Sequence, residues 1–250
     1  MTAIEVVLFD LDDTLFEHTR AVRIGVAAHR LANDLAGDEA EQFARWSALE
    51  EHHYHRYLSG ETGFREQRRA RARDFVAPYG LDLTADDAAD EWFGHYLIEY
   101  QRAWRLHDDV LPLLDLLTQR LGIITNAELE FQLGKLNAMA VTERFEHVIA
   151  SGIVGAAKPD PEIFRFAAAA YSVEPARVAY VGDRFQTDAI GASNAGMLGI
   201  WLDRTDAATA ADRNTATEQG VAIIRSLAEV PAVLAGADLV IRNEPPPGWE

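Results

Sequence analysis

The chain has 250 residues, of which 48% are hydrophobic, so it is long enough to form one large domain or two modest ones. A formal net charge of −17 and the absence of cysteine argue against a nucleic-acid partner, a disulfide framework and thiol chemistry. The N-terminus lacks the pattern of a signal peptide, and no long apolar run predicts a transmembrane helix. We therefore expect a soluble, cytoplasmic protein that does not bind membranes.

Short runs of apolar, often β-branched residues recur along the chain and are separated by segments with helical periodicity. Such runs are typical of strands that are buried on both faces of a sheet. Strands that alternate with helices form βαβ units, so the pattern predicts an α/β fold with a Rossmann-like, doubly wound parallel sheet. The runs cover residues 6–9, 121–125, 147–150, 178–181 and 198–202.

Helices are expected between these runs. Asp160 is a suitable N-cap, Pro161 suits the first helical position, and Gly196 suits the residue after a helix end. A further strand-like run and a helix are expected within residues 221–234, and the tail NEPPPGWE, residues 243–250, is expected to be loose. The other expected helices cover residues 111–121, 128–139, 161–171 and 188–195.

The segment between the first two runs is about ninety residues long, too long for a structureless loop inside a compact domain. It has helical periodicity, for example at Trp92, Tyr96 and Tyr100, and it is interrupted by turn residues such as Gly60 and Gly63. We therefore expect a helical bundle, residues 17–106, inserted into a core that consists of residues 1–16 and 107–250.

Polar side chains follow four of the predicted strands. Because ligands bind at the carboxyl ends of the strands in an open parallel sheet, we expect these side chains to converge on one edge. They are Asp10, Asp12 and Thr14 after the first run, Thr125 and Asn126 at the second, Lys158 after the third, and Asp183 and Asp188 after the fourth.

Crowded carboxylates repel one another unless a cation offsets their charge. A hard divalent cation with oxygen ligands suits this set, and Mg²⁺ suits it best if a phosphate also binds. Thr125, Asn126 and Lys158 are hydrogen-bond donors appropriate for phosphoryl oxygens. The sequence thus predicts a site for a metal ion and a phosphoryl group.

Four motifs in this order resemble those of the haloacid dehalogenase (HAD) superfamily of aspartate-nucleophile phosphotransferases. The motifs are DLDDT, IITNA, the lysine of AAKPDPEIF, and VGDRFQTD, and together they extend from Asp10 to Asp188. Each motif alone is a weak signal, but four in order after predicted strands are specific. The helical insert similarly resembles the C1 cap of this superfamily.

The resemblance implies a role for each matched residue. Asp10 is the expected nucleophile, which forms an aspartyl-phosphate, and Asp12 is the expected general acid and general base. The expected phosphate-binding residues are Thr125, Asn126 and Lys158. The expected Mg²⁺ ligands are the Asp10 carboxylate, the backbone carbonyl of Asp12, Asp183, and Asp188 either directly or through Lys158 or water.

Asp12 distinguishes two activities of the family that the chain resembles. Dehalogenases of that family lack an aspartate two positions after the nucleophile, because a halide leaves without a proton. The resemblance therefore implies a Mg²⁺-dependent phosphomonoesterase that acts on a small metabolite phosphate. A phosphomutase, or a binding or regulatory protein without useful turnover, remains an alternative, and neither the substrate nor the oligomeric state can be read from the sequence.

Other polar clusters are interpreted as structural. Lys135 matches no motif and is expected to be solvated, so Lys135→Arg is expected to change little. His52, His53 and His55 do not share one helix face and are expected to lie on a solvated, partly packed surface. The arginine-rich segment, residues 65–73, is likewise expected to be a solvated face.

Overall fold

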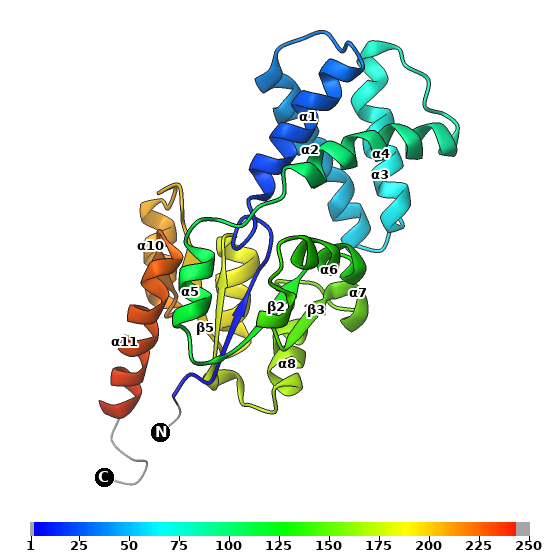
Figure 1. Ribbon diagram of the computed structural model, residues 1–250. Coiled ribbons are helices and arrows are strands. Elements are labelled where there is room, and N and C mark those ends of the chain that lie inside the picture. The colour runs from blue at the N-terminus through cyan, green and yellow to red at the C-terminus, as the bar shows by residue number, and fades with distance from the viewer. Residues whose placement is uncertain (1–2, 244–250) are drawn as a thin grey trace. The chain divides into compact units, whose positions relative to one another are not determined.

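The computed structural model describes residues 3–243, which form two compact units (Figure 1). One unit, called the α/β unit below, contains residues 3–16 and 106–243. The other, called the helical unit, contains residues 17–105 and is inserted between the first two strands of the α/β unit. The tail that the sequence analysis expected to be loose lies outside the described residues from position 244 onward.

The α/β unit is built on a six-stranded parallel sheet with the strand order β3-β2-β1-β4-β5-β6. This is the doubly wound order of Rossmann-like folds, so the predicted fold class is confirmed. The central strands consist of continuous apolar residues and are buried along their whole length. The strands are β1 (Val6–Phe9), β2 (Arg120–Thr125), β3 (His147–Ala150), β4 (Val178–Gly182), β5 (Leu198–Leu202) and β6 (Ala222–Ile224).

Helices surround the sheet (Figure 1). As predicted, the Asp160 side chain caps α8 by accepting a hydrogen bond from the backbone N–H of Glu162, and Pro161 is the first helical residue. Phe164 of this helix packs edge-on against Tyr180 of β4, with ring centroids 5.1 Å apart. The α-helices are α5 (Val110–Leu116), α6 (Leu129–Ala138), α7 (Ser151–Val154), α8 (Pro161–Ala170), α9 (Gly191–Asn194), α10 (Ala210–Glu218) and α11 (Val230–Asn243).

Two predicted helices differ from the observed structure. The helix predicted over residues 111–121 ends at Leu116, because Leu117 adopts an extended conformation and β2 begins at Arg120. The helix predicted over residues 188–195 is a π-helical segment, Phe185–Ile190, followed by the short helix α9. This wider turn places Asp188 inside the segment rather than at the first position of a helix.

The helical unit contains α1 (His18–Ala32), α2 (Glu39–Leu58), α3 (Phe64–Val76) and α4 (Asp86–Arg102). Its core is aromatic: the ring centroid of Trp46 lies 4.4 Å from that of Tyr96 and 5.0 Å from that of Phe75. Gly25 allows α1 to approach α4 closely, because a Cβ atom there would lie 3.1 Å from the Tyr100 backbone nitrogen. Aromatic residues at helical spacing therefore form a core rather than a surface platform.

The arginine-rich segment is not the solvated face that the sequence analysis expected. Arg71 is 5% exposed and is paired with Glu50 of α2. Arg69 forms ion pairs with Asp86 and Asp90 of α4, at 2.7 and 2.6 Å respectively. The expectation was wrong because acidic residues on two neighbouring helices lie opposite this face, and helical periodicity alone does not show them.

The histidine-rich segment of α2 is partly buried, as expected, and its three histidines do not converge. His53 is buried and its Nε2 lies 2.8 Å from an Asp74 carboxylate oxygen, whereas His52 and His55 are exposed.

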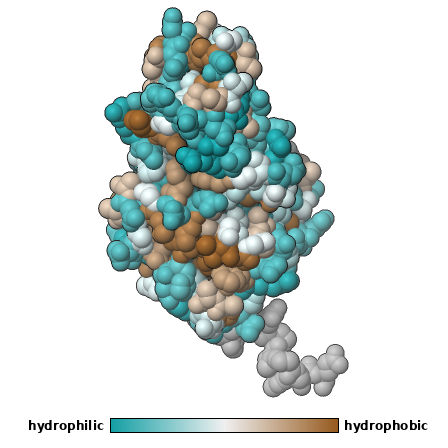
Figure 2. Space-filling model, turned by 90° about the vertical axis from the view of Figure 1, so that its right-hand side faces the viewer, coloured by the Kyte–Doolittle hydropathy of each residue, from teal (hydrophilic) through white to brown (hydrophobic). Residues whose placement is uncertain are grey.

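Hydrophobic residues also reach the surface, as the brown patches in Figure 2 show. In the α/β unit, the large exposed apolar side chains include Ile153 and Phe166. Apolar atoms contribute more than half of the surface of ordinary folded proteins, so this exposure does not by itself mark a binding site. Within residues 3–243, none of the helices has both the length and the apolar character needed to cross a membrane.

Candidate active site

The carboxyl ends of three adjacent parallel strands bring the predicted site residues together. Asp10 directly follows β1, Thr125 ends β2, and Asp183 directly follows β4. The chain continues from β1 toward one edge of the sheet and from β4 toward the other. A crevice outside the strands at such a reversal is the usual ligand site of doubly wound folds.

Lys158 lies at the centre of the site. Its ammonium nitrogen is 2.6 Å from Asp10 Oδ1 and 2.7 Å from Asp188 Oδ1, and it donates a hydrogen bond to the Tyr180 hydroxyl at 2.7 Å. Lys158 is 5% exposed, Asp10 8% and Asp188 1%. A compact ammonium that contacts two buried carboxylates stabilises their negative charge.

Asp188 is held in place from several directions. Its Oδ2 accepts a hydrogen bond from the backbone N–H of Arg184 at 2.9 Å, and its Oδ1 accepts one from the Tyr180 hydroxyl at 3.3 Å. Gly182 makes room for it, because a Cβ atom at that position would lie 2.4 Å from Asp188 Cγ. The glycine of the VGDRFQTD motif is thus required by side-chain packing rather than by an unusual backbone angle.

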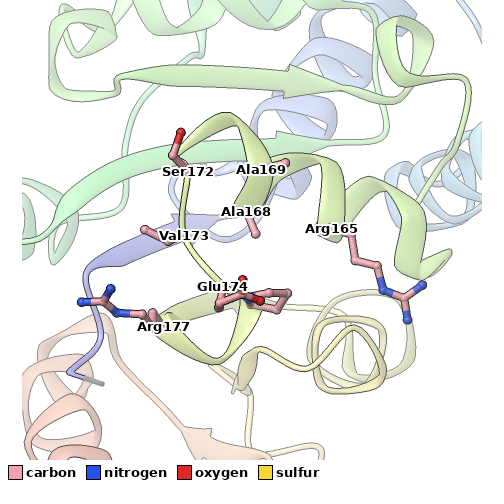
Figure 3. Close-up of a pocket in the computed structure, with 8 residues that line it drawn as sticks. Arg165, Ala168, Ala169, Ser172, Val173, Glu174 and Arg177 are labelled. Atoms are coloured by element: carbon pink, nitrogen blue, oxygen red, sulfur yellow. The ribbon is translucent and has the colours of Figure 1, made fainter. Parts of the chain in front are cut away.

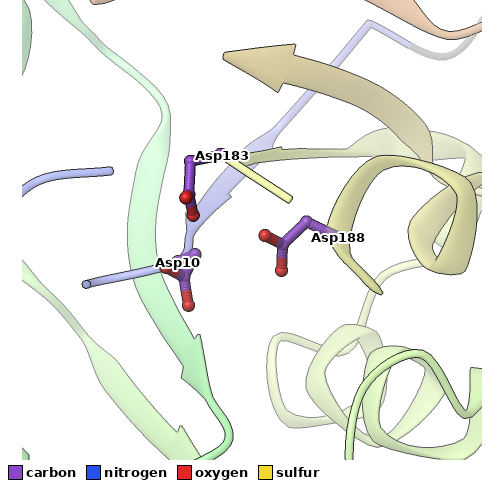
Figure 4. Close-up of side chains that lie close together, drawn as sticks. All are labelled: Asp10, Asp183 and Asp188. Carbon is purple, nitrogen blue, oxygen red and sulfur yellow. The ribbon is translucent and has the colours of Figure 1, made fainter. Parts of the chain in front are cut away.

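Asp10, Asp183 and Asp188 are arranged as a candidate metal site. Figure 4 shows the three carboxylates pointing toward one another, and one oxygen from each lies within 4.8 Å of the others. The Thr14 hydroxyl contacts Asp10 at 3.4 Å and Asp183 at 3.5 Å. Carboxylate oxygens are the ligands that Mg²⁺ prefers, so the donor set fits this ion.

The electrostatics of the cluster also favour a bound cation. Burial raises the pKa of Asp10 from 3.8 to about 6, although the Lys158 ammonium opposes the shift. Burial and the neighbouring carboxylates of Asp10 and Asp188 raise the pKa of Asp183 well above its usual value. Burial lowers the pKa of Lys158, but Asp10 and Asp188 outweigh it and raise that pKa. The single Lys158 ammonium therefore does not neutralise the negative charge of the three carboxylates, whereas an additional divalent cation would do so.

Asn126 is hydrogen-bonded to the backbone of Lys158, and its phosphate-binding role stays a prediction. Its side-chain amide accepts a hydrogen bond from the Lys158 backbone N–H at 2.7 Å and donates one to the Lys158 carbonyl at 2.8 Å. These bonds fix the backbone from which the Lys158 side chain extends. Thr125 is buried at the end of β2, and its hydroxyl accepts a hydrogen bond from the Gln132 amide at 2.8 Å.

Lys135 corrects an expectation from the sequence. It was expected to be solvated, but it is 1% exposed, and its ammonium nitrogen lies 2.5 Å from Asp12 Oδ1. Gln132, one helical turn earlier on α6, donates a hydrogen bond to Asp12 Oδ2 at 3.1 Å. The Asp12 carboxylate is not a member of the Asp10–Asp183–Asp188 cluster, so Lys135 and Gln132 hold it apart from the candidate metal site.

Sequence analysis did not select Tyr180, Gln132 or Lys135 as site residues. Tyr180 lies inside an apolar strand and gave no signal. Gln132 and Lys135 are three residues apart on one face of the helix after Thr125, and Lys135 is one of only two lysines in the chain. The three-residue separation of Gln132 and Lys135, together with the rarity of lysine in this chain, is a signal from which the pair could have been found.

A surface pocket elsewhere in the α/β unit does not contain these residues (Figure 3). It is lined by residues of α8 and of the segment that leads into β4, including Arg165, Ser172, Glu174 and Arg177. Arg177 precedes β4, whereas Asp183 follows it, so the pocket lies at the amino end of the strand and the candidate site at its carboxyl end.

The fold and the site define a class: a Rossmann-like α/β protein with an acidic cluster and a buried lysine at the carboxyl edge of a doubly wound parallel sheet. The family model for haloacid dehalogenase-like hydrolases matches residues 4–196. The chain is 30% identical over 220 residues to a glyceraldehyde 3-phosphate phosphatase of Pyrococcus abyssi, an alignment that covers 80% of this chain and 81% of the relative. The chain therefore belongs to the haloacid dehalogenase-like hydrolases, and the resemblance inferred from its motifs is confirmed.

Other comparisons agree with this assignment. A phosphoserine phosphatase of Thermus thermophilus is 42% identical over 84 residues, an alignment that spans 34% of each chain. The HAD-hydrolase YfnB of Bacillus subtilis has a similar structure, with a TM-score of 0.78 and 19% identity over 93% of this chain and 99% of that chain. Haloacid dehalogenases are also among the similar structures, so the fold by itself does not separate dehalogenation from phosphate hydrolysis.

Proposed function

We propose that this protein is a Mg²⁺-dependent phosphomonoesterase that hydrolyses a small metabolite phosphate through a phosphorylated Asp10. The observation that carries the proposal is the presence of two separate carboxylates after β1. Asp10 lies in the acidic cluster beside Lys158, and Asp12 lies outside that cluster, held by Lys135 and Gln132. This separation supports the proposal that Asp10 is the nucleophile and that Asp12 transfers the proton.

In the first step, an oxygen of Asp10 attacks the phosphorus of the substrate, and the bond between phosphorus and the leaving oxygen breaks. The Asp12 carboxyl gives its proton to that oxygen, so the product leaves as a neutral alcohol. Lys158 and Thr125 stabilise the phosphoryl oxygens as charge shifts onto them. Asn126 contributes indirectly, because it holds the Lys158 backbone.

In the second step, a water molecule attacks the phosphorus of phospho-Asp10, and the bond between phosphorus and the Asp10 oxygen breaks. Asp12 is now a carboxylate and accepts a proton from that water. Inorganic phosphate leaves and Asp10 is regenerated. The two steps together return Asp12 to its protonated form, so protons balance over one cycle.

Asp10, Asp183 and Asp188 would hold the Mg²⁺ ion, together with the backbone carbonyl of Asp12. When bound, the ion supplies positive charge that reduces the repulsion between a carboxylate nucleophile and a phosphate dianion. Two structural facts support this assignment: the three carboxylates converge, and burial with mutual repulsion raises the pKa of both Asp10 and Asp183.

The helical unit is proposed to act as a cap that selects the leaving group. Its insertion point supports this role, because the chain enters the unit at Glu17, seven positions after the nucleophile. A cap of this kind would exclude water during the first step and admit it for the second.

Dehalogenation is a less suitable function for this site. A halide leaves without a proton, so Asp12 and the two residues that hold it would have no task in that reaction. The two relatives described above, from Pyrococcus abyssi and Thermus thermophilus, are phosphatases. The same relatives favour small phosphorylated metabolites as the substrate class of this chain.

A phosphate-release screen over a panel of metabolite phosphates with Mg²⁺ tests the proposal, with 2-chloropropionate as the dehalogenase control. We expect phosphate release from at least one class of phosphomonoester and no chloride release. Asp10→Asn is expected to stop turnover with every substrate and to abolish the phosphoenzyme. Chloride release without phosphate release would overturn the proposal, and conversion of a phosphate ester to its isomer without free phosphate would indicate a phosphomutase.

A further inference from the structure

Lys135 is a buried cation on the helix that follows Thr125. It lies on α6, is 1% exposed, and its ammonium nitrogen is 4.7 Å from the centre of the Phe16 ring. Burying an ammonium is costly unless it is paired. Its pairing with Asp12 Oδ1 at 2.5 Å joins residues that are far apart in the sequence. The fold therefore places this lysine specifically against the second carboxylate of the DLDDT motif.

Gln132 completes the arrangement around Asp12. It is three residues before Lys135, on the same helix face, and is fully buried. Its amide nitrogen donates to Asp12 Oδ2 at 3.1 Å and to the Thr125 hydroxyl oxygen at 2.8 Å. Lys135 thus holds one oxygen of the Asp12 carboxylate and Gln132 holds the other.

The Asp12 side chain is less buried than the residues that hold it. It is 31% exposed, whereas the Lys135 side chain is 2% exposed. Without partners, a carboxylate on the short Asp12 side chain could rotate freely toward solvent. With both oxygens held from the α6 side, it has one orientation, and Gln132 ties that orientation to Thr125, a residue proposed to contact the phosphoryl group.

We propose that Lys135 and Gln132 are positioning residues for the proton-transfer steps of this enzyme, acting through Asp12. This inference rests on the proposed function, because it assigns these two residues to the acid/base chemistry of that same site. In the first step they orient the Asp12 proton toward the leaving oxygen, and in the second they orient the Asp12 carboxylate toward the attacking water. Lys135 acts on the Asp12 carboxylate, so the transfer of the phosphoryl group to Asp10 should not depend on it when the leaving group needs no proton. Gln132 also donates to Thr125, so its loss should affect the binding of the phosphoryl group as well.

Lys135→Met tests the proposal, because methionine fills a similar volume without the ammonium. With an alkyl phosphate, kcat should fall by about 10- to 100-fold while KM changes little, since misplacing a catalytic group by about 1 Å costs a factor of this size. With a nitrophenyl phosphate, phospho-Asp10 should form at the wild-type rate and then break down slowly. Rapid acid quench and mass spectrometry of the intact protein measure both rates.

A double mutant separates positioning from general stability. In an Asp12→Asn background, Lys135→Met should cause no further loss of kcat, because the group through which Lys135 acts is already absent. A purely structural role would lower kcat by a similar factor in both backgrounds and would overturn the proposal. Gln132→Met is the second variant, and it should also slow the breakdown of phospho-Asp10. It should in addition slow the formation of phospho-Asp10, because Thr125 loses a hydrogen bond.

Arg144→Met is the matched control, because Arg144 is a cation of the same unit that pairs with Asp115 at 2.8 Å, away from the site residues. It should retain wild-type rates with both substrates. If wild-type protein turns over normally and Lys135→Met and Gln132→Met do so too, this proposal is wrong and the proposed function stands. If the wild type forms no phosphoenzyme and releases no phosphate, both the proposed function and the positioning role are wrong. If both variants fail to fold, the pair is structural and the positioning role is rejected.

Discussion

Asn126 and Lys158 hold each other through two hydrogen bonds between one side chain and one backbone. The Lys158 N–H donates to Asn126 Oδ1 at 2.7 Å, and Asn126 Nδ2 donates to the Lys158 carbonyl at 2.8 Å. The pair joins the loop after β2 to the segment between α7 and α8, and the Lys158 ammonium reaches Asp10 from this fixed backbone. The position of the proposed phosphate-binding lysine therefore depends on an asparagine that holds its backbone.

Asn126→Ala is expected to lower kcat by about 10- to 100-fold, because the Lys158 backbone loses both bonds and its ammonium shifts relative to Asp10. Lys158→Arg is expected to lose at least as much, since a planar guanidinium does not reproduce the three contacts of the ammonium. Steady-state phosphate release measures both effects. Arg144→Lys exchanges the same two residue types away from the site and is the control. Lys135→Arg is not a suitable control, because Lys135 is buried against Asp12. Wild-type kcat in Asn126→Ala would contradict the positioning role.

Removal of divalent metal should abolish turnover. The Asp10, Asp183 and Asp188 oxygens lie within 4.8 Å of one another, so we expect a bound cation to offset their repulsion during catalysis. We expect EDTA to stop phosphate release, Mg²⁺ to restore it, and Ca²⁺ to fail, because Ca²⁺ coordination is larger and less regular. The measurement is phosphate release after metal depletion and back-titration, and full activity in excess chelator would show that the cluster has no metal-dependent task.

The stability of the metal-free protein should depend on pH in a defined direction. The pKa of Asp10 is raised from 3.8 to about 6 in the folded protein, so the folded state binds the proton more tightly than the unfolded state. This contribution to stability is fully present below about pH 4 and is lost as the pH rises through about 6. Thermal unfolding in EDTA should therefore show a falling Tm between these values.

Mg²⁺ and Asp10→Asn provide the checks on that pH dependence. Added Mg²⁺ should raise the Tm more at pH 7 than at pH 5, because the ion replaces the proton that the cluster has lost. Asp10→Asn should weaken the fall in Tm, since asparagine does not titrate. A Tm in EDTA that rises between pH 4 and pH 6, with no change in Asp10→Asn, would mean that other groups control this range.

Gly182→Ala should damage the site through Asp188. The added methyl group would lie 2.4 Å from Asp188 Cγ, so the carboxylate has to move, and overpacking of this kind costs about 1–3 kcal/mol of stability. We expect a lower Tm together with weaker Mg²⁺ activation of phosphate release. Gly94→Ala on α4 is the control, because a Cβ atom there has no neighbour within 4 Å and alanine favours a helix. Equal behaviour of the two variants would reject the packing argument.

Replacement of residues 17–105 with a short linker tests the proposed cap. The site residues described above all belong to the α/β unit, so this unit should still bind Mg²⁺. The rates of phosphate release from different substrates should become more similar, because the unit that is proposed to select the leaving group has been removed. Calorimetric Mg²⁺ titration and the phosphate-release panel measure the two properties, and an unchanged ranking in the shortened protein would assign selectivity to the α/β unit.

The strand pattern and the motifs could be predicted because they depend on local sequence. A strand buried on both faces needs a continuous apolar run, as in Val6–Phe9, and polar residues directly after such runs lie at the carboxyl edge of a parallel sheet. The convergence of Asp10, Asp183 and Asp188 follows from that rule and from the order of the motifs. The start of the helix predicted over residues 188–195 was wrong. The residues of the π-helical segment Phe185–Ile190 do not differ in type from those of an ordinary α-helix, so the sequence does not show the wider turn.

Only the tertiary structure decided which partners the polar side chains have. Helical periodicity shows that Gln132 and Lys135 share a face, but not that Asp12, more than a hundred residues earlier, lies opposite that face. The same holds for Asn126, whose amide bonds to the backbone of Lys158, and for Tyr180, whose hydroxyl reaches Asp188 from within an apolar strand. The sequence by itself determined the sheet and its acidic edge, because these depend on burial and strand order. Packing of α6 against that edge determined how the Asp12 carboxylate is held, because such contacts arise between segments that no local pattern connects.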